Sequence, residues 1–258
     1  MLLSVIIPAR DEAESLKMTV SGLAEHLRLE AIPFEIVIVD DGSSDPTYPL
    51  ACRLMSVYPE VHPVINTGEH GFGRAVAFGI RASRGYAIAI FMADSSDSPQ
   101  DLVTYYRKLE EGYECVFGSR FMKCGAVIDY PPHKLFLNRL ANYFIAVLFG
   151  LRFYDTTNAF KCYRRNVVEG LQPLISCHFN LTVEMPLKAI IRGYSYAVVP
   201  ITWRNRSHGI SKLKIREMGS RYLFIVLYLW LEKLLARNDY ARRCTPEQTP
   251  APQRQENN

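Results

Sequence analysis

Two apolar runs in this chain each end in a cluster of acidic residues, and this pairing restricts the fold more than any other feature. The runs read Glu35-Ile-Val-Ile-Val-Asp-Asp-Gly-Ser-Ser and Tyr86-Ala-Ile-Ala-Ile-Phe-Met-Ala-Asp-Ser-Ser-Asp. A continuous apolar run is typical of a buried parallel strand, and ligands of open α/β sheets lie beyond the carboxyl ends of such strands. Carboxylates at that edge are costly unless they bind something. A hard cation with a phosphate, or the polar face of a nucleotide, would satisfy them.

Strand-like and helix-like segments alternate over the first 120 residues. This order predicts an α/β fold with a mostly parallel sheet and helices on both of its faces. The predicted strands cover residues 2–7, 35–39, 61–66, 86–92 and 114–118. The first predicted helix ends near residue 29, and the next three cover residues 47–58, 75–83 and 99–111. In the less regular second half, helices are predicted over residues 133–153, 181–192 and 216–237, and a strand over 197–201.

The composition narrows the class of partner. A net charge of +4 over 258 residues is too weak to indicate nucleic acid, but it suits an anionic substrate or an anionic membrane surface. The six cysteines are scattered without C-x-x-C or zinc spacing, so we expect reduced thiols in a cytosolic chain. Residues 238–258 lack apolar content and are expected to be disordered.

Six short motifs follow one another in an order that is known from one family. The first three are Ser4-Val-Ile-Ile-Pro-Ala-Arg-Asp-Glu-Ala-Glu, Val39-Asp-Asp-Gly-Ser-Ser-Asp and Ala93-Asp-Ser-Ser-Asp. The later three are Phe117-Gly-Ser-Arg-Phe, Asp155-Thr-Thr-Asn-Ala-Phe-Lys-Cys-Tyr-Arg and Arg206-Ser-His-Gly-Ile-Ser-Lys. With them the chain resembles the GT-A glycosyltransferases of family 2, and more closely their polyprenyl-phosphate (dolichyl-phosphate) mannosyl/glucosyltransferase branch. The resemblance implies a GT-A domain over residues 1–215, with a nucleotide-sugar half (1–120) and an acceptor half (121–215). An apolar, interfacial helix (216–237) and the disordered tail would follow.

In that family the first loop and the Asp-Asp-Gly-Ser turn hold the nucleotide. The resemblance implies that Asp41, or Asp40 beside it, accepts a hydrogen bond from a base N–H, because a buried carboxylate discriminates well between bases. The alternative for both residues is that they cap the next helix. The other positions carried over for nucleotide-sugar binding are Pro8, Ala9, Arg10, Glu12, Val39 and Ala93.

The family's Asp-x-Asp element binds Mg²⁺ or Mn²⁺, which bridges the donor diphosphate. Here Met92 stands in place of the first aspartate, whereas Asp94 fits the second and Ser96 lies where a further ligand is often found. Asp97 could replace the lost carboxylate, since one or two carboxylates plus substrate phosphates suffice for Mg²⁺. Its alternative role is to cap the helix after Pro99. The expected metal ligands are therefore Asp94, Ser96 and Asp97.

Three cations are expected to contact phosphate. The resemblance assigns Arg120, Arg206 and Lys212 to the donor diphosphate or the acceptor phosphate, and with Asp94 they form the expected catalytic set. The glycine between Arg206 and Lys212 would let that loop close over the substrate. The alternative for this segment is a solvated basic loop.

The implied reaction is metal-assisted, inverting transfer of a hexose to a polyprenyl or dolichyl phosphate. The donor would be a nucleotide-diphosphate sugar of the GDP-mannose or UDP-glucose type. A phosphate acceptor is ionised near pH 7 and needs no dedicated base. A hydroxyl acceptor needs one, for which Asp155 and Glu184 are candidates, and structural hydrogen bonding is the alternative for both. Two other hypotheses are a family 2 transferase acting on a polysaccharide, lipid or protein hydroxyl, and a non-catalytic nucleotide-sugar binder with Met92 in a degenerate metal site.

Two segments suit a membrane interface. Residues 143–151 and 222–231 are short, aromatic-rich and flanked by basic residues, although core helices look the same. No apolar run approaches the ~20 residues of a membrane span. We therefore expect a cytoplasmic protein, peripheral on the cytosolic face of a membrane, with a membrane-anchoring partner subunit as a further hypothesis.

Overall fold

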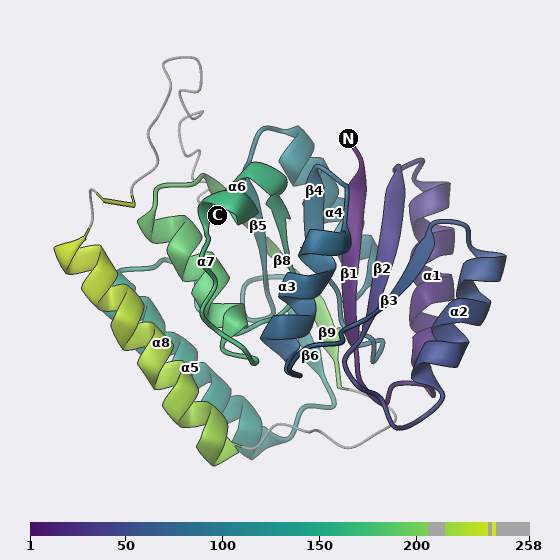
Figure 1. Cartoon of the computed structure of the whole chain (residues 1–258). Coiled ribbons are helices and arrows are strands. Elements are labelled where there is room, and N and C mark those ends of the chain that lie inside the picture. The colour runs from purple at the N-terminus through teal and green to yellow at the C-terminus, as the bar shows by residue number, and fades with distance from the viewer. Residues whose placement is uncertain (206–214, 237–238, 241–258) are drawn as a thin grey trace.

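A seven-stranded sheet forms the centre of the computed structural model, which describes residues 1–205, 215–236 and 239–240 (Figure 1). The strands lie in the order β3-β2-β1-β4-β7-β5-β8. All neighbours are parallel except β7, which is antiparallel to both β4 and β5. The mostly parallel sheet is thus confirmed, whereas β7 is an addition to the predicted strands. The strands are β1 (Leu3–Ala9), β2 (Phe34–Asp40), β3 (Val61–Ile65), β4 (Ala87–Ile90), β5 (Cys115–Ser119), β7 (Lys161–Arg164) and β8 (Tyr196–Pro200).

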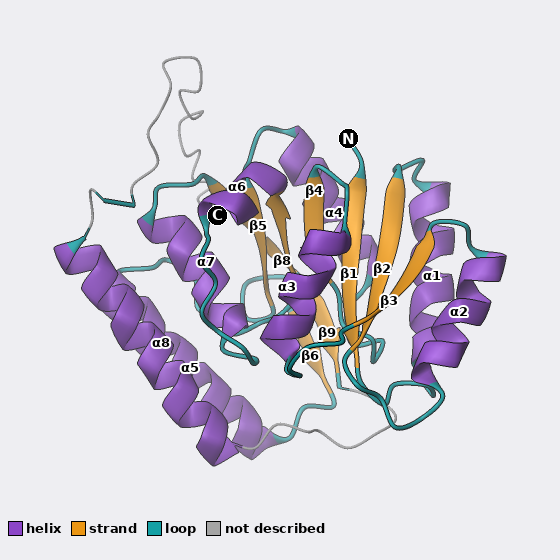
Figure 2. Cartoon of the chain, in the orientation of Figure 1, coloured by secondary structure: helices purple, strands orange, loops and turns teal. Residues whose placement is uncertain are grey.

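Helices cover both faces of this sheet (Figure 2), as the alternation of segments predicts. Helices α1, α2 and α4 share one hydrophobic core with the sheet, and helices α3, α6 and α7 share the other. Helices α5 and α8 lie side by side at the edge of the second core (Figure 1). The helices are α1 (Leu16–Leu29), α2 (Thr47–Val57), α3 (Phe72–Ala82), α4 (Pro99–Glu110), α5 (Pro132–Phe149), α6 (Arg165–Gly170), α7 (Leu181–Ile191) and α8 (Ile215–Leu235).

The central strands explain where the acidic segments lie. Every residue of β1 and β2 is buried, which accounts for their continuous apolar sequence without alternation. Both strands and β4 point the same way, so the loops after all three meet at one edge of the sheet. The two acidic clusters of the sequence are therefore neighbours at that edge.

A small parallel ribbon lies beside this edge. It pairs β6 (Ala126–Ile128) with β9 (Thr202–Arg204), two strands that the sequence patterns do not predict because each has only three residues. The amide of Arg204 donates to the carbonyl of Ser96 at 3.2 Å, which ties the ribbon to the acidic turn after β4.

Helices α5 and α8 end near their predicted bounds but carry many exposed apolar side chains. Helix α5 ends at Phe149, four residues short of the prediction's last residue, 153, and the Gly150 that follows it adopts a left-handed φ of 67°. Exposed apolar residues on the two helices include Phe136, Tyr143, Val147, Phe224 and Leu235. Among the described residues, no helix has the length and apolar content needed to cross a bilayer. The predicted tail lies outside the described residues, apart from residues 239–240.

Candidate active site

The turn after β4 is built around two buried carboxylates. The amide of Met92 donates to Oδ2 of Asp97 at 2.9 Å, and the amide of Ser96 donates to Oδ1 of Asp94 at 3.2 Å. Asp94 and Asp97 are each 6% exposed. Asp97 therefore closes its own turn. The alternative that it caps α4 is wrong, since Ser98 occupies that position and no side chain caps the helix.

The acidic turn suits a divalent cation, with few protein ligands. Burial raises the pKa of Asp97 to about 7; the amide of Met92 opposes the rise and the charge of Asp94 adds to it. A bound cation would offset this repulsion. In the described part of the chain, no group of three or more His, Cys, Asp or Glu side chains is placed to hold a metal ion. Asp94 and Asp97 would thus supply at most two carboxylates, with Ser96 beside them, and substrate oxygens and water would complete the shell.

The two aspartates after β2 have different surroundings. Asp41 is fully engaged: Oδ1 accepts from Nδ2 of Asn66 at 2.7 Å, and Oδ2 accepts from the amide of Gly71 at 2.8 Å. It thereby anchors the glycine-rich loop that leads into α3. Asp40 accepts from the amide of Ser43 at 3.4 Å through Oδ2, whereas its buried Oδ1 has no partner among the described residues. An orphaned buried carboxylate oxygen costs free energy unless a ligand donates to it, which favours Asp40 over Asp41 as the acceptor for a base N–H.

Neither aspartate caps α2. That helix begins at Thr47 after Pro46, and no side chain caps it.

The other residues that the sequence predicts for nucleotide-sugar binding lie around the same edge of the sheet. Pro8 and Ala9 pair with Val39 and Asp40 at the ends of β1 and β2, Arg10 and Glu12 lie in the next loop, and Ala93 is buried in the acidic turn.

Arg120 enters the site from the end of β5 and is held by Asp155. Its Nε donates to Oδ2 at 2.9 Å, its Nη2 donates to Oδ1 at 2.6 Å, and its amide also donates to Oδ2 at 2.7 Å. Although burial works against the charge, Asp155 raises the pKa of Arg120 above its usual value. Nη2 also lies 3.5 Å from Oδ1 of Asn138. No described residue accepts a hydrogen bond from Nη1, the one terminal nitrogen that neither Asp155 nor Asn138 holds.

Lys161 is a buried cation that the sequence patterns do not identify. It lies on β7, is 1% exposed, and donates through Nζ to the carbonyls of Thr156 at 3.0 Å, Thr182 at 3.1 Å and Asn158. Burial lowers its pKa to about 7, and Asp155 opposes that shift. Its three bonds hold the loop that carries Asp155, and so they support Arg120.

The two candidate general bases have structural partners. Asp155 is fully buried against Arg120. Glu184 is also fully buried and accepts from the amides of Ile175 and Ser176 and from Nζ of Lys188 at 2.6 Å. Structural hydrogen bonding therefore accounts for both carboxylates, and neither is placed to take a proton from a hydroxyl acceptor.

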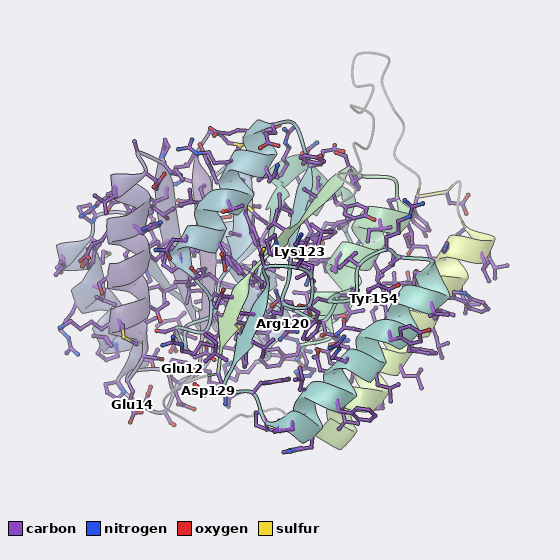
Figure 3. All side chains as sticks on the ribbon, turned by 180° about the vertical axis from the view of Figure 1, so that it is seen from behind. Glu12, Glu14, Arg120, Lys123, Asp129 and Tyr154 are labelled. Carbon is purple, nitrogen blue, oxygen red and sulfur yellow. The ribbon has the colours of Figure 1, made fainter. Side chains whose placement is uncertain are left out.

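A cavity of about 460 Å³ connects the acidic turn with the pair of helices α5 and α8. Its charged wall contains Asp94, Asp97 and Arg120, which is 7% exposed and is labelled in Figure 3. A second part of the wall is largely apolar and comes from α5 and α8. Those apolar lining residues are Leu137, Ala141, Phe144, Ile145, Leu223 and Val226.

Two polar residues of α5 also line this cavity, although they are absent from the predicted site. Lys134 and Asn138 lie one turn apart on the cavity side of the helix, and Asn142 follows at the same spacing. Nδ2 of Asn142 donates to Oδ1 of Asn138 at 3.0 Å and to Oγ1 of Thr157 at 2.9 Å. The signal in the sequence is a polar residue at every fourth position of an otherwise apolar helix.

The other two cations of the predicted site, Arg206 and Lys212, lie outside the described residues.

Comparison with known proteins assigns the family. The family model of glycosyl transferase family 2 matches residues 4–171. Polyprenol monophosphomannose synthase of Mycolicibacterium smegmatis is 34% identical over 223 residues, covering 83% of this chain and 82% of that protein. Dolichol-phosphate mannosyltransferase of Pyrococcus furiosus is 32% identical over 217 residues, covering 83% of this chain and 60% of that protein. The chain therefore belongs to glycosyl transferase family 2.

Solved structures show the same fold at lower identity. Glucosyl-3-phosphoglycerate synthase of Mycobacterium tuberculosis, in complex with Mn²⁺, UDP and phosphoglyceric acid, has a TM-score of 0.64 at 15% identity. The match covers 91% of this chain and 78% of that one. The same enzyme in complex with Mg²⁺ and UDP gives the same TM-score and identity. These structures confirm the GT-A architecture.

Proposed function

We propose that this glycosyltransferase transfers a hexose from a nucleotide-diphosphate sugar to a polyprenyl phosphate, with a divalent metal and with inversion at the anomeric carbon. The observation that carries this proposal is the cavity of about 460 Å³, which joins a charged wall to an apolar one. An acceptor with an anionic head and an isoprenoid tail has the same two parts. One relative is named polyprenol monophosphomannose synthase and the other dolichol-phosphate mannosyltransferase, and both names support the same acceptor class.

The residues of the site divide the work between donor and acceptor. The nucleotide would lie against the ends of β1 and β2, with Asp40 accepting from the base. Asp94, Ser96 and Asp97 would hold Mg²⁺ or Mn²⁺, which would offset the charge on the departing nucleoside diphosphate. Arg120 would bind a phosphate through Nη1 while Asp155 fixes its orientation.

The transfer itself is one displacement. A phosphate oxygen of the acceptor forms a bond to the anomeric carbon as the bond from that carbon to the donor diphosphate breaks, and the nucleoside diphosphate leaves. The attacking oxygen is already ionised near pH 7, so no proton has to be removed. The structural engagement of Asp155 and Glu184 favours this acceptor over a hydroxyl.

The exposed apolar side chains of α5 and α8 support binding of the protein to a membrane surface through these two helices. The cavity between these helices continues the same apolar surface, so an isoprenoid tail could pass from a bilayer to Arg120 without crossing water. We place the protein peripherally, on the cytosolic face. A membrane-anchoring partner subunit remains a hypothesis.

The first experiment measures radiolabelled sugar transfer to a short polyprenyl phosphate. UDP-glucose, GDP-mannose and UDP-N-acetylhexosamines are supplied in turn with Mg²⁺, Mn²⁺ or EDTA. We expect metal-dependent label in the organic phase from one donor. Label on a hydroxyl acceptor in the absence of polyprenyl phosphate would overturn the proposed acceptor.

Asp94→Asn tests the metal site. The variant should keep its fold, because asparagine retains the carbonyl oxygen that accepts from Ser96, but transfer should fall at least about 100-fold as a metal carboxylate is lost. Asp129→Asn is the matched control: Asp129 is exposed, does not line the cavity, and has a φ of 58° that asparagine readily adopts. Full nucleotide affinity without metal, together with an inactive wild type, would favour a non-catalytic binder.

A further inference from the structure

Two aromatic side chains line the cavity but have no role in the transfer reaction as described above. Tyr130 and Trp203 both line the cavity, and their ring centroids are 5.0 Å apart in a T-shaped arrangement with an interplanar angle of 82°. Both side chains are partly buried, so each keeps some surface for a ligand. Large aromatic surfaces left accessible inside a polar site are costly to hydrate and are suited to contact with a ligand.

The small ribbon places this pair at the charged wall. Trp203 is the central residue of β9 and lies opposite Val127 of β6. The next residue, Arg204, donates its amide to the carbonyl of Ser96 in the acidic turn at 3.2 Å. The guanidinium of Arg120 lies 5.8 Å from the Trp203 ring centroid. Trp203 is therefore fixed between the turn that carries Asp94 and the arginine that faces phosphate.

The hexose of the donor is the group that would occupy the space beside Trp203. The acidic turn belongs to the departing diphosphate and Arg120 is placed for phosphate, so the hexose must lie between them during a single displacement. A hexose ring presents C–H groups on its faces and hydroxyl groups around its rim. The negative face of an aromatic ring attracts the weakly positive C–H groups of the sugar. In this arrangement the hydroxyl groups on the sugar's rim point away from the aromatic ring and can form hydrogen bonds elsewhere.

We propose that Tyr130 and Trp203 bind the hexose of the donor, with the Trp203 ring against a C–H face of the sugar, and that this contact helps to select the sugar. This inference rests on the proposed function, because it assumes a nucleotide-sugar donor. The packing of Trp203 against Tyr130 and Arg120 also fixes its rotamer, which reduces the entropy lost when the sugar binds. The apolar tail of the acceptor has its own wall on α5 and α8.

The chain allows a direct optical test, because it contains only two tryptophans, Trp203 and Trp230. Trp230 lies on α8 and does not line the cavity, so Trp230→Phe leaves Trp203 as the single reporter. Emission from this variant is measured with Mg²⁺ and UDP-glucose or GDP-mannose, with UDP or GDP alone, and with a short polyprenyl phosphate alone. We expect the active nucleotide sugar to change the emission, and the matching nucleotide alone to leave it unchanged.

Other responses would overturn the inference. An equal change with the nucleotide alone would place Trp203 against the base, ribose or diphosphate. A change with polyprenyl phosphate alone would place it against the acceptor. If the wild type transfers sugar to lipid phosphate while Trp203 does not respond to the sugar, this inference fails and the proposed function stands. If no donor supports transfer to lipid phosphate, the proposed function fails instead.

Kinetics of Trp203 variants provide a second readout. Trp203→Leu should raise the KM for the active nucleotide sugar about tenfold, whereas Trp203→Phe should raise it less, because phenylalanine keeps an aromatic face. The inhibition constant of the free nucleotide and the KM for polyprenyl phosphate should stay near their wild-type values. Equal losses for all three ligands would indicate a structural role and contradict sugar binding.

Discussion

Asp155 determines where the guanidinium of Arg120 points. In Asp155→Asn the charge of Arg120 would stay buried without its carboxylate, so we expect the free energy of unfolding to fall by about 3–5 kcal/mol and transfer to be largely lost. Urea unfolding and the lipid-phosphate assay measure the two effects. The double variant Arg120→Met/Asp155→Asn should recover part of the stability but none of the activity. Recovery of transfer in that variant would show that Arg120 does not contact substrate.

Lys161 gives the protein a specific dependence on pH. Its folded-state pKa of about 7 lies below the ordinary lysine value of about 10.4, so the unfolded chain binds more protons between these values. The contribution of Lys161 to stability should therefore rise with pH from about 7 to about 10, with a slope of at most ~1.4 kcal/mol per pH unit, whereas the buried thiols of Cys115 and Cys162, whose pKa values are raised, lower stability at the alkaline end of this range. The charges acting on Lys161 are those of Asp155, Arg120 and Asp97.

The measurement compares denaturant midpoints of the wild type and Lys161→Met between pH 6 and pH 9.5. The difference in midpoint between wild type and variant should increase with pH in favour of the wild type, whatever the absolute stability of either protein. Parallel profiles of wild type and variant would mean that the carbonyls of Thr156, Asn158 and Thr182 keep the ammonium group charged throughout this range.

At the scale of elements, the start of α3 is packed directly against the loop before α7. The amide of Gly73 donates to the carbonyl of Cys177 at 3.1 Å, and a Cβ at Gly73 would overlap the carbonyl oxygen of Ser176. Gly73→Ala should thus lower the free energy of unfolding by about 1–3 kcal/mol. Gly22→Ala is the control, since a Cβ at Gly22 on α1 meets nothing within 4 Å and should stabilise the helix by ~0.5–1 kcal/mol. Similar effects of both substitutions on urea unfolding would contradict this packing argument.

The elements also show what the sequence could predict. Long apolar runs identified the central strands, and the acidic clusters after them predicted which loops share an edge, because parallel strands end together. Strand β7 escaped because Lys161-Cys-Tyr-Arg has only four residues and begins with a buried lysine, a residue type that is normally exposed. The roles of Asp40 and Asp41 could not be separated from sequence, since they depend on contacts with Asn66 and Gly71, 25 or more residues away.

At the scale of the whole molecule, α5 and α8 form an exposed apolar surface. We expect the double variant Val147→Asp/Phe224→Asp, at positions 64% and 63% exposed, to bind anionic vesicles at least about tenfold more weakly, with little change in stability. Vesicle flotation measures the binding. Leu29→Asp is the control, because Leu29 is 82% exposed but lies on α1, away from this surface. Equal loss in both variants would argue against a membrane seat on α5 and α8.

The antiparallel strand β7 has a consequence for how the chain is made. β1, β2, β3 and β4 can pair as soon as they leave the ribosome, since every partner among them is synthesised nearby and the last of these strands ends at Ile90. β5 is synthesised next, yet both of its neighbours, β7 and β8, come later. A nascent chain of about 120 residues therefore carries a strand with two open edges, a state that invites aggregation. Translation must run on to residues 161–164 and 196–200 before that strand is shielded. We therefore expect the nascent chain to depend most on chaperones after β5 has been synthesised and before β7 and β8 have paired with it.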